Sequence, residues 1–427
     1  MKPGLDKAEL NHSIRPQDDL FRHVNGLWLE NTSIPEDQAV YGSFMILRDD
    51  SELAVKEVLE DAAANPRPGV AQQIGDLYAS FLDEDRIEKL GAQPLEDGLD
   101  RIASVSNRSE FFRLLGALER EGVPGIWGSY VDNDAGNPER YLVHMYQGGI
   151  GLPDKDYYTD EKYEDIRTEY VPHISRMLML AGWSATDAID AAQAIYALES
   201  KIATHHWSRV ESRDAEKTYN LKDLAGLKSL NKKILWDEYL AGAALKSSLL
   251  DWNVVMMPSF FEGIEELLSD DHLETWKLWL SWVLVRSYAP YLSSGFVEER
   301  FAFYGTKLTG QPVNRPRWKR AVGLVEGSLG EAVGQIYVEK HFPASSKKKM
   351  EVLVGHLIEA YRQSITNLDW MTEETKVKAL EKLSKFTPKI GYPDKWKDYS
   401  AIQISREDLV GNVRRVSSWE FDYHANK

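Results

Sequence analysis

A long helical pattern between two prolines, from Arg315 to Pro343, constrains the fold of this sequence more than any other stretch. Pro316 suits the first turn of a helix, where its missing N–H group costs nothing, and a helix cannot continue through Pro343. Apolar residues recur between the prolines at spacings of three or four, which places them on one face of a helix: Trp318, Val322, Val325, Leu329, Val333 and Ile336. The stretch therefore predicts one long helix whose apolar face lies in the core.

A second stripe on the same helix consists of glycines, and its members are Gly323, Gly327, Gly330 and Gly334. Each glycine inside a helix costs roughly 0.5–1 kcal/mol relative to alanine. A close packing contact would offset that cost, so we expect another helix to lie directly against the stripe. We interpret the helix as a structural element with no chemistry of its own.

Length and composition exclude several classes of protein. A chain of 427 residues suits two or three domains, or one large helical body with appendages. Its 51 basic and 67 acidic residues give a formal charge of −16, which disfavours nucleic acid and anionic membranes as partners. The sequence contains no cysteine, which excludes disulfides, thiol catalysis and cysteine-ligated zinc and favours a reducing compartment.

The sequence also shows neither a signal-peptide pattern nor a membrane-spanning run. Residues 1–19 are polar and lack the apolar core of a signal peptide. The most apolar run, 278–285, is far shorter than the ~20 residues that span a bilayer. We expect a soluble protein with no membrane partner and a cytoplasmic location, although export by a leaderless route stays open.

The remaining pattern predicts a mainly α fold: a large multi-helical domain with one small β-hairpin. Helical spacing or cap signals favour helices at 36–64, 72–90, 96–102, 109–121, 163–182, 185–206, 221–230, 258–268, 274–293, 345–367 and 372–386. Aromatic and β-branched residues at 126–131 and 141–146 flank a turn-rich segment, which predicts the hairpin. A last helix begins near Arg406 and reaches Lys427 without a stop signal, which indicates that the chain continues.

Two patterns have both a structural and a functional interpretation. The glycine-rich segment 148–153 could hold a phosphate, but a dinucleotide motif requires glycine at the position of Asp154, so a turn is favoured. Three tryptophans at a spacing of three, Trp276, Trp279 and Trp282, could form a ligand platform. Core packing is the more common role of such a stripe.

The sequence shows no catalytic motif. None of the ten histidines is followed by glutamate in an H-E-x-x-H arrangement, and no nucleophile elbow or Walker motif occurs. His356 and Glu359 stand at a spacing found in metal-binding bundles, but no second such pair accompanies them. We expect structural or surface histidines and, on this chain, neither a catalytic residue nor a metal ligand.

Several ordered motifs resemble one family over nearly the whole chain, the M13 family of zinc metalloendopeptidases, which includes neprilysin and the PepO-type peptidases. The matching segments are Asp18-Asp19-Leu20-Phe21, Val24-Asn25-Gly26-Leu27-Trp28, Ile34-Pro35, 41–49, 151–158, Phe303-Tyr304-Gly305, 315–320, 329–334, Tyr337-Val338 and 389–394. The order and number of these matches indicate the N-terminal part of such a peptidase, of the soluble bacterial type.

The resemblance implies which parts of such a peptidase this chain supplies and which lie elsewhere. In the family, the H-E-x-x-H helix, the third zinc ligand and an Asn-Ala substrate-binding segment lie beyond the point where this sequence ends. Residues 1–50 are then expected to pack with the catalytic half, residues 51–390 to form the helical domain that encloses substrate, and residues 391–427 to begin the crossing into the catalytic domain. Peptides and the C-terminal catalytic portion, on the same or a separate chain, would be the partners. Zinc would bind the completed enzyme and not this chain alone.

The resemblance also implies a substrate-binding site at Val40, Phe44, Met45 and Arg48. Phe44 and Arg48 match the family pocket for side chains that follow the cleaved bond. Val40 and Met45 stand where neprilysin-like members have an Arg and an Asp that help to hold a substrate's terminal carboxylate. On the predicted helix, Val40, Phe44 and Arg48 would share one face. We therefore expect internal cleavage and an apolar residue in the pocket.

Two functions remain open at this point. The chain is either the substrate-enclosing portion of a zinc endopeptidase, inactive alone, or a stand-alone, non-catalytic module that binds peptides or other proteins.

Overall fold

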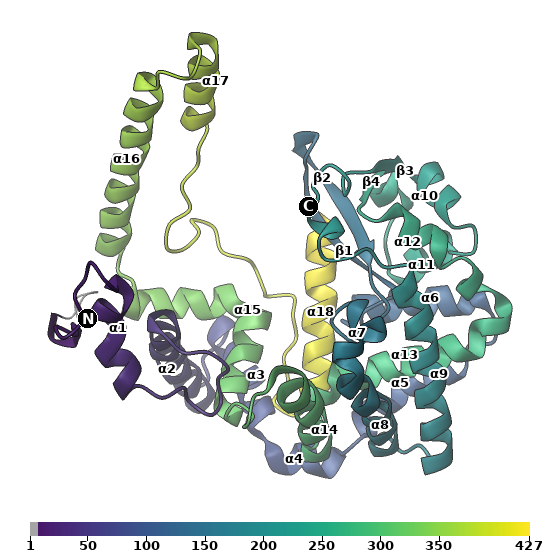
Figure 1. Ribbon diagram of the computed structural model, residues 1–427. Helices are drawn as coiled ribbons and strands as arrows, with labels where there is room; N and C mark the ends of the chain where they lie inside the picture. The colour runs from purple at the N-terminus through teal and green to yellow at the C-terminus, as the bar shows by residue number, and fades with distance from the viewer. Residues whose placement is uncertain (1–6) are drawn as a thin grey trace.

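A computed structural model describes residues 7–427 and confirms the mainly α prediction. Figure 1 shows three parts: a larger lobe around a small sheet, a smaller lobe that includes the long helix predicted between Arg315 and Pro343, and a projecting pair of helices. None of the described helices is both long and apolar enough to cross a membrane.

The larger lobe contains a four-stranded sheet in the order β1-β2-β4-β3. The predicted hairpin is present as β1 (Trp127–Asp134) and β2 (Asn137–Gln147), which pair antiparallel. Two further strands were not predicted: β4 (Trp252–Val255) runs parallel to β2, and β3 (Leu221–Asp223) pairs antiparallel with β4. The helix predicted at 221–230 is therefore wrong at its start, because the first three residues pair with a distant strand before Asp223 caps α10 (Leu224–Leu230).

The helices of the larger lobe enclose one continuous apolar core. They are α5 (Glu96–Ala103), α6 (Arg108–Arg120), α7 (Asp156–Thr159), α8 (Glu164–Leu180), α9 (Ala185–Thr204), α11 (Trp236–Gly242), α12 (Pro258–Gly263), α13 (Leu273–Tyr288) and α14 (Ser294–Arg300), together with α10. Trp276, Trp279 and Trp282 of α13 are all buried in this core. The structural interpretation of the tryptophan stripe is confirmed.

The glycine-rich segment after β2 forms a turn, as predicted, and a buried hydrogen-bond cluster fixes it. The Tyr158 hydroxyl accepts the backbone N–H groups of Gly151 and Leu152, both at 3.1 Å. The same hydroxyl donates to Glu199 Oε2 at 2.7 Å, and Tyr170 donates to that oxygen at 2.9 Å. Burial raises the pKa of Glu199. The segment therefore has a structural role in this lobe.

The smaller lobe has a separate apolar core. It is built from α2 (Ser43–Ala64), α3 (Val70–Leu82), α4 (Glu84–Leu90) and α15 (Arg317–His341). The predicted apolar face of α15 is confirmed, because Val322, Val325, Leu329 and Val333 are buried against α2 and α3. The helix is not uniform, however, since Leu329 has non-helical φ and ψ of −127° and 36° at a kink.

The glycine stripe of α15 does not pack against a helix. A Cβ built at Gly323, Gly327 or Gly330 would meet no other atom within 4 Å, and only Gly334 is close to another residue, with the Trp396 ring at 3.3 Å. The predicted close helix contact is therefore wrong for the described residues. The apolar stripe, and not the glycine stripe, packs α15 against α2 and α3.

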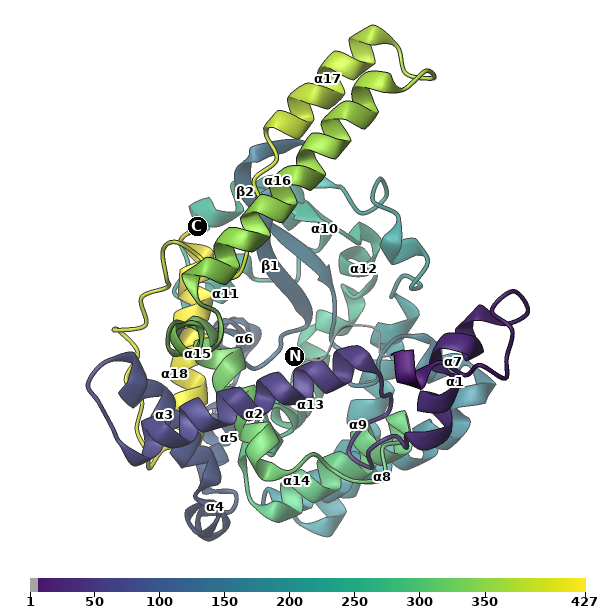
Figure 2. The same ribbon diagram turned by 90° about the vertical axis from the view of Figure 1, so that its left-hand side faces the viewer.

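The third part, which we call the arm, consists of α16 (Ala344–Asn367) and α17 (Glu373–Ser384). Figures 1 and 2 show this pair projecting away from both lobes. Neither helix buries a single residue. The predicted start of the second helix near Thr372 is confirmed by a cap signal, because the Thr372 side chain accepts the Thr375 N–H.

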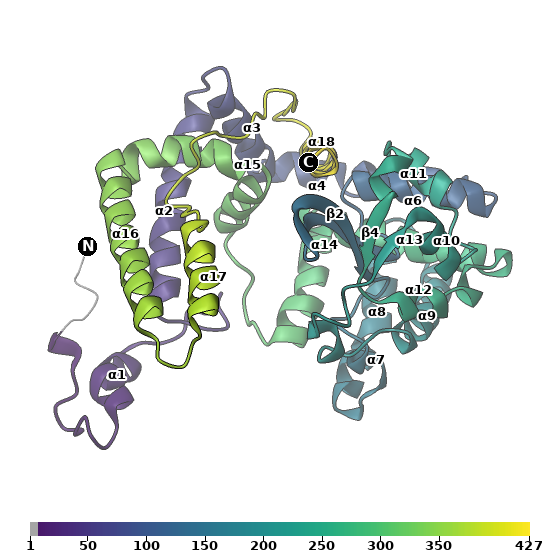
Figure 3. The same cartoon turned by 90° about the horizontal axis from the view of Figure 1, so that it is seen from above.

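The C-terminal helix α18 (Leu409–Ala425) joins the two lobes. It contacts α3 and α15 on one side and α6 and β1 on the other, and Figure 3 shows it between the two sides of the molecule. Near the N-terminus, α1 (Leu20–Asn31) begins at the cap residue Asp19 and lies at the edge of the smaller lobe (Figure 2).

Candidate functional site

The four predicted site residues lie around the start of α2, but their geometry differs from the expectation. The helix begins at Ser43 and not at Glu36, because a hydrogen bond from the Gln38 N–H to the Pro35 carbonyl closes a turn at 2.9 Å. Val40 therefore precedes the helix. The prediction that it shares a helix face with Phe44 and Arg48 is wrong.

The apolar members of the group are presented to solvent to different degrees. Phe44 is 82% exposed and Val40 is 65% exposed, which is unusual for side chains of this type, whereas Met45 is half-buried. Phe44 lies in the first turn of α2, one turn before Arg48. This end of the helix offers an aromatic ring and part of a guanidinium to a ligand.

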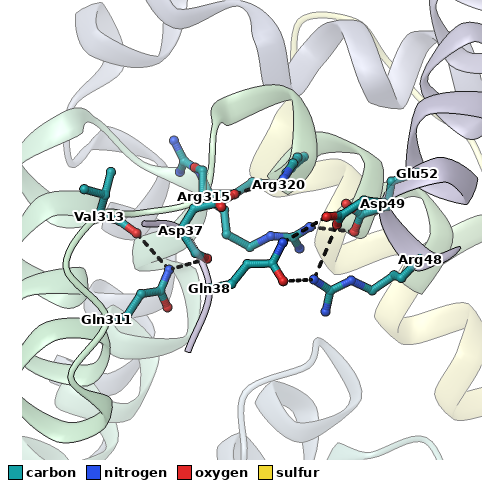
Figure 4. Close-up of polar contacts among 10 residues, drawn as sticks. Asp37, Gln38, Arg48, Asp49, Glu52, Gln311, Val313, Arg315 and Arg320 are labelled. Carbon is teal, nitrogen blue, oxygen red and sulfur yellow. Dashed lines mark hydrogen bonds and ion pairs between the residues drawn. The ribbon is translucent and has the colours of Figure 1, made fainter. Parts of the chain in front are cut away.

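Arg48 is held in place by two side chains (Figure 4). Its Nη2 donates to Gln38 Oε1 at 3.1 Å and lies 3.5 Å from Asp49 Oδ1. The buried Gln38 in turn donates from Nε2 to Asp49 Oδ2 at 3.0 Å. The guanidinium is thus oriented and partly neutralised before any ligand arrives, and it keeps 44% of its side chain exposed.

The turn that carries Gln38 is fixed from the other side by residues near α15. Asp37 forms an ion pair with Lys319 Nζ at 3.0 Å. The Gln311 side-chain amide donates to the Asp37 carbonyl at 3.1 Å and to the Val313 carbonyl at 2.8 Å (Figure 4). Since Asp37 and Lys319 are each only 15% exposed, this pair is screened less than a surface pair.

A second ion pair fixes α2 one turn further on. Arg315 Nη2 donates to Glu52 Oε1 at 2.5 Å, and the Arg320 Nε donates to the Arg315 carbonyl at 3.2 Å. Charge-assisted contacts of this kind are roughly twice as strong as neutral hydrogen bonds. The start of α2 is therefore a rigid platform, which is the property that a binding site requires.

Sequence reasoning missed the residues that support this platform. Gln38, Asp37 and Glu52 carry no spacing signal. The partners of Asp37 and Glu52 lie more than 250 positions away, whereas Gln38 contacts Arg48 and Asp49 across the turn before α2. The segment 315–320 belongs to the family motifs quoted above, and that match was the available signal. No role could be deduced from it, because the contacts are between distant parts of the chain.

The described residues contain no cluster that could hold a metal. Among residues 7–427, no group of three or more His, Asp or Glu side chains has the required proximity. Glu359 is engaged by Arg362 at 2.6 Å and by Gln363 at 2.9 Å, so it is not paired with His356. His206 is a structural residue whose Nε2 contacts the Gly148 carbonyl at 2.8 Å, and burial lowers its pKa to about 4.

Comparison with known proteins identifies the family. The family model described as "Peptidase family M13" matches residues 16–393. The chain belongs to peptidase family M13. The resemblance inferred from the motifs is thereby confirmed.

Relatives in the M13 family extend this finding. Neprilysin-3 of Drosophila melanogaster is 27% identical over 90% of this chain and 51% of its own length, and mouse neprilysin is 28% identical over 90% and 55%. The chain thus spans about half the length of these curated relatives.

Two solved structures have the same fold as this chain. The Mycobacterium tuberculosis zinc metalloprotease ZMP1, in complex with an inhibitor, is 43% identical with a TM-score of 0.92, covering 99% of this chain and 64% of that one. PepO from Lactobacillus rhamnosis is 22% identical with a TM-score of 0.84 over 96% and 66%, which shows a shared fold.

Proposed function

We propose that this chain forms the substrate-enclosing portion of a zinc-dependent metalloendopeptidase that hydrolyses peptides. Its membership in peptidase family M13 supports the reaction class. The described residues do not fit a zinc site. In this proposal the metal therefore belongs to a C-terminal catalytic portion, which is on the same polypeptide or on a second chain.

The single observation that carries this proposal is the apolar surface of the arm. Met350, Leu353, Leu357 and Tyr361 recur along α16 at spacings of three and four, and all four are exposed. An amphipathic helix of this kind normally buries its apolar stripe against another element. A contiguous exposed stripe marks an interaction surface, and the catalytic portion is the partner that the family membership supplies.

The N-terminal segment supports the same assignment. Leu20 and Phe21 of α1 are each 63% exposed, and Leu29 is 46% exposed. In the proposed arrangement, residues 1–50 and the arm contact the catalytic portion, the helical region within 51–390 encloses the peptide, and the crossing into the catalytic domain begins within 391–427. Because the sequence has no cysteine, we place the completed enzyme in a reducing compartment such as the cytoplasm.

Metal analysis and a peptidase assay test this function. The purified 427-residue chain is expected to hold no stoichiometric zinc and to cleave no peptide. Addition or fusion of a C-terminal M13 portion that carries the H-E-x-x-H helix should restore both. A Leu353→Glu, Leu357→Glu variant of the arm should weaken the association, whereas the matched control Glu351→Gln, Lys348→Gln should not. Equimolar zinc and cleavage by the chain alone would contradict the proposal.

A stand-alone peptide-binding module is the alternative, and the exposed Phe44 ring is the observation that favours it. The two functions differ in one measurable respect. A binding module would hold peptides tightly without a second portion, and the added catalytic portion would leave its peptide affinity unchanged.

We further propose that Val40, Phe44, Met45 and Arg48 bind the side chain that follows the cleaved bond. The contacts of Arg48 with Gln38 and Asp49 occupy part of its hydrogen-bonding capacity, and Val40 and Met45 supply no charge. A free substrate carboxylate would therefore find a weak partner here. This supports a preference for cleavage inside peptides.

A charge introduced at position 40 tests the specificity proposal. In the completed enzyme, Val40→Arg should raise the preference for a free C-terminal carboxylate over its amide about tenfold or more, since a charge-assisted contact contributes roughly 1.5–3 kcal/mol. Ala39→Arg adds the same charge one residue away and should leave the ratio of kcat/KM values unchanged. An unchanged ratio in Val40→Arg would refute this role.

A further inference from the structure

A cavity of about 370 Å³ lies between the sheet and the C-terminal helix, away from the start of α2. Its walls come from β1, β2, α6, α11 and the last turns of α18, which lies beside β1 in Figure 1. Most of the lining is apolar or aromatic, and the members used below are Trp127, Tyr130, Leu249 and Phe421. A cavity of this size and lining is typical of a small-molecule site.

One carboxyl group stands among these apolar walls, and none of residues 7–427 gives it a cationic partner. Glu119 Oε2 accepts the Tyr239 hydroxyl at 2.8 Å, and Oε1 accepts the Ser129 hydroxyl at the longer distance of 3.4 Å. Both donors are neutral. Burial raises the pKa of Glu119 to about 7, which reflects the cost of an ionised carboxylate in an apolar cavity without a counter-charge.

The other polar groups of the cavity add negative charge and a free donor. Glu420 of α18 also lines the cavity, and its Oε1 lies 3.8 Å from His424 Nε2. Burial lowers the pKa of that histidine, so it is mostly neutral at pH 7. No lysine or arginine lines the cavity within the described chain. The buried Trp127 Nε1 has no hydrogen-bond partner in the described part of the protein.

From this geometry we propose that the cavity binds a small organic cation, a protonated amine carried on an aromatic or aliphatic group. The ammonium would form an ion pair with Glu119, while the rings of Trp127, Tyr130 and Phe421 would contact its apolar part. Aromatic faces also attract a desolvated ammonium directly. The site is independent of the proposed peptidase function, since it shares no residue with the platform at α2.

Binding of a cation in this cavity should release protons, as the titratable groups that face the ligand show. The titratable residues at the cavity are Glu119 from α6, Tyr130 from β1, Tyr239 from α11, and Glu420 and His424 from α18. Tyr130 and Tyr239 stay protonated at neutral pH, because burial raises the pKa of each. Since the pKa of Glu119 is about 7, binding of a cation at pH 7 should ionise it and release about half a proton.

Calorimetry with three matched probes tests the proposal on the full chain. Tryptamine is cationic, 3-ethylindole is its neutral counterpart, and indole-3-propionate is anionic. Tryptamine should bind at least tenfold more tightly than the neutral probe, and the anion should bind least. Titrations in buffers of different ionisation enthalpy should measure the number of protons released on binding. Equal affinities for the three probes, or no binding of tryptamine, would overturn the proposal.

Two variants locate the site. Glu119→Gln keeps the size of the side chain and should abolish both the tenfold preference and the proton release, whereas the exposed Glu161→Gln in the same lobe should change neither. Leu249→Trp fills the cavity without altering the carboxyl group, so it should weaken tryptamine and 3-ethylindole alike. A Glu119→Gln variant that still prefers tryptamine tenfold, or a Leu249→Trp variant with wild-type affinities, would refute the assignment.

Discussion

The larger lobe and the arm are built from helices with similar apolar periodicity, but only the lobe covers its apolar faces. Nine residues of α13 are buried, whereas the longer α16 buries none. The glycines show the same contrast: Gly116 lies where α6 crosses α11, while Gly355 of α16 faces open space, as do Gly323 and Gly327 of α15 in the smaller lobe. Periodicity thus tells which residues share a face. It does not tell whether another element covers that face.

The largest change in stability should appear when one tryptophan of the larger lobe is replaced, and the same replacement in the arm should have little effect. Trp279 is 1% exposed in the larger lobe and Trp370 is 74% exposed at the tip of the arm. Trp279→Ala should lower the free energy of unfolding by about 3–5 kcal/mol, because it leaves a cavity in a packed core. Trp370→Ala should change it by less than about 0.5 kcal/mol in the isolated chain. Urea denaturation followed by circular dichroism measures both, and equal effects would break the comparison.

The next largest effect should be the pH dependence of stability that a buried histidine of the larger lobe causes. His206 is 6% exposed, and its pKa falls from 6.5 to about 4 on folding because burial disfavours the charged ring. The unfolded chain therefore binds more protons between pH 6.5 and 4. Stability from this group is present above pH 6.5 and is lost as the pH falls, by about 3 kcal/mol in all.

The variant His206→Gln removes the titration and keeps a donor for the Gly148 carbonyl. Its free energy of unfolding should therefore fall less steeply than that of the wild type between pH 6.5 and 4, which urea titrations at several pH values measure. His341→Gln, at an exposed histidine of α15, should keep the wild-type slope. A wild-type slope in His206→Gln would show that this ring does not carry the difference.

A smaller loss of stability is expected from a substitution where α6 and α11 of the larger lobe cross. A Cβ at Gly116 would overlap the Tyr239 carbonyl and lie 2.9 Å from the Ala243 nitrogen. Both are backbone atoms of the neighbouring segment, so they cannot rotate away. Gly116→Ala should destabilise the chain by about 1–3 kcal/mol through overpacking, as measured by urea denaturation. A neutral result would mean that α6 and α11 separate without cost.

Much of the fold could be predicted from the sequence, because long helices carry their own signals. The periodicity of α9 and α13 and the cap at Thr372 required no knowledge of distant residues. The short strands β3 and β4 could not be predicted, because three or four residues show no period and are defined only by pairing across the chain. The start of α2 was misplaced because Pro35 opens a turn and not a helix.

The candidate site was predictable only in part. The resemblance to the family pointed to Phe44 and Arg48. The support of Arg48 by Gln38 depends on the turn that precedes α2, and the fixation of α2 by Arg315 depends on a contact between distant segments. Glu119 gave no sequence signal either, since 67 acidic residues offer no reason to choose one. Its character comes from the apolar cavity around it, which only the assembled lobe creates.

The smallest expected effect has the opposite sign and sharpens the comparison most. A Cβ at Gly327 would meet no atom within 4 Å, and its φ is not positive, so alanine fits without strain. Gly327→Ala should stabilise the isolated chain by about 0.5–1 kcal/mol through helix propensity. A destabilised variant, measured by urea denaturation, would show that this face of α15 is not open.

The same substitution can then be carried into the completed enzyme, where its meaning changes. If Gly327 is glycine because a catalytic portion approaches α15 closely, Gly327→Ala should stabilise the isolated chain and yet weaken association with that portion. Gly355→Ala on α16, another glycine with open space around it, provides the matched control for helix propensity. Stabilisation of the chain by both variants, with weaker association only for Gly327→Ala, would assign the missing contact of the glycine stripe to the partner. Unchanged association would leave the stripe with no packing role in either state.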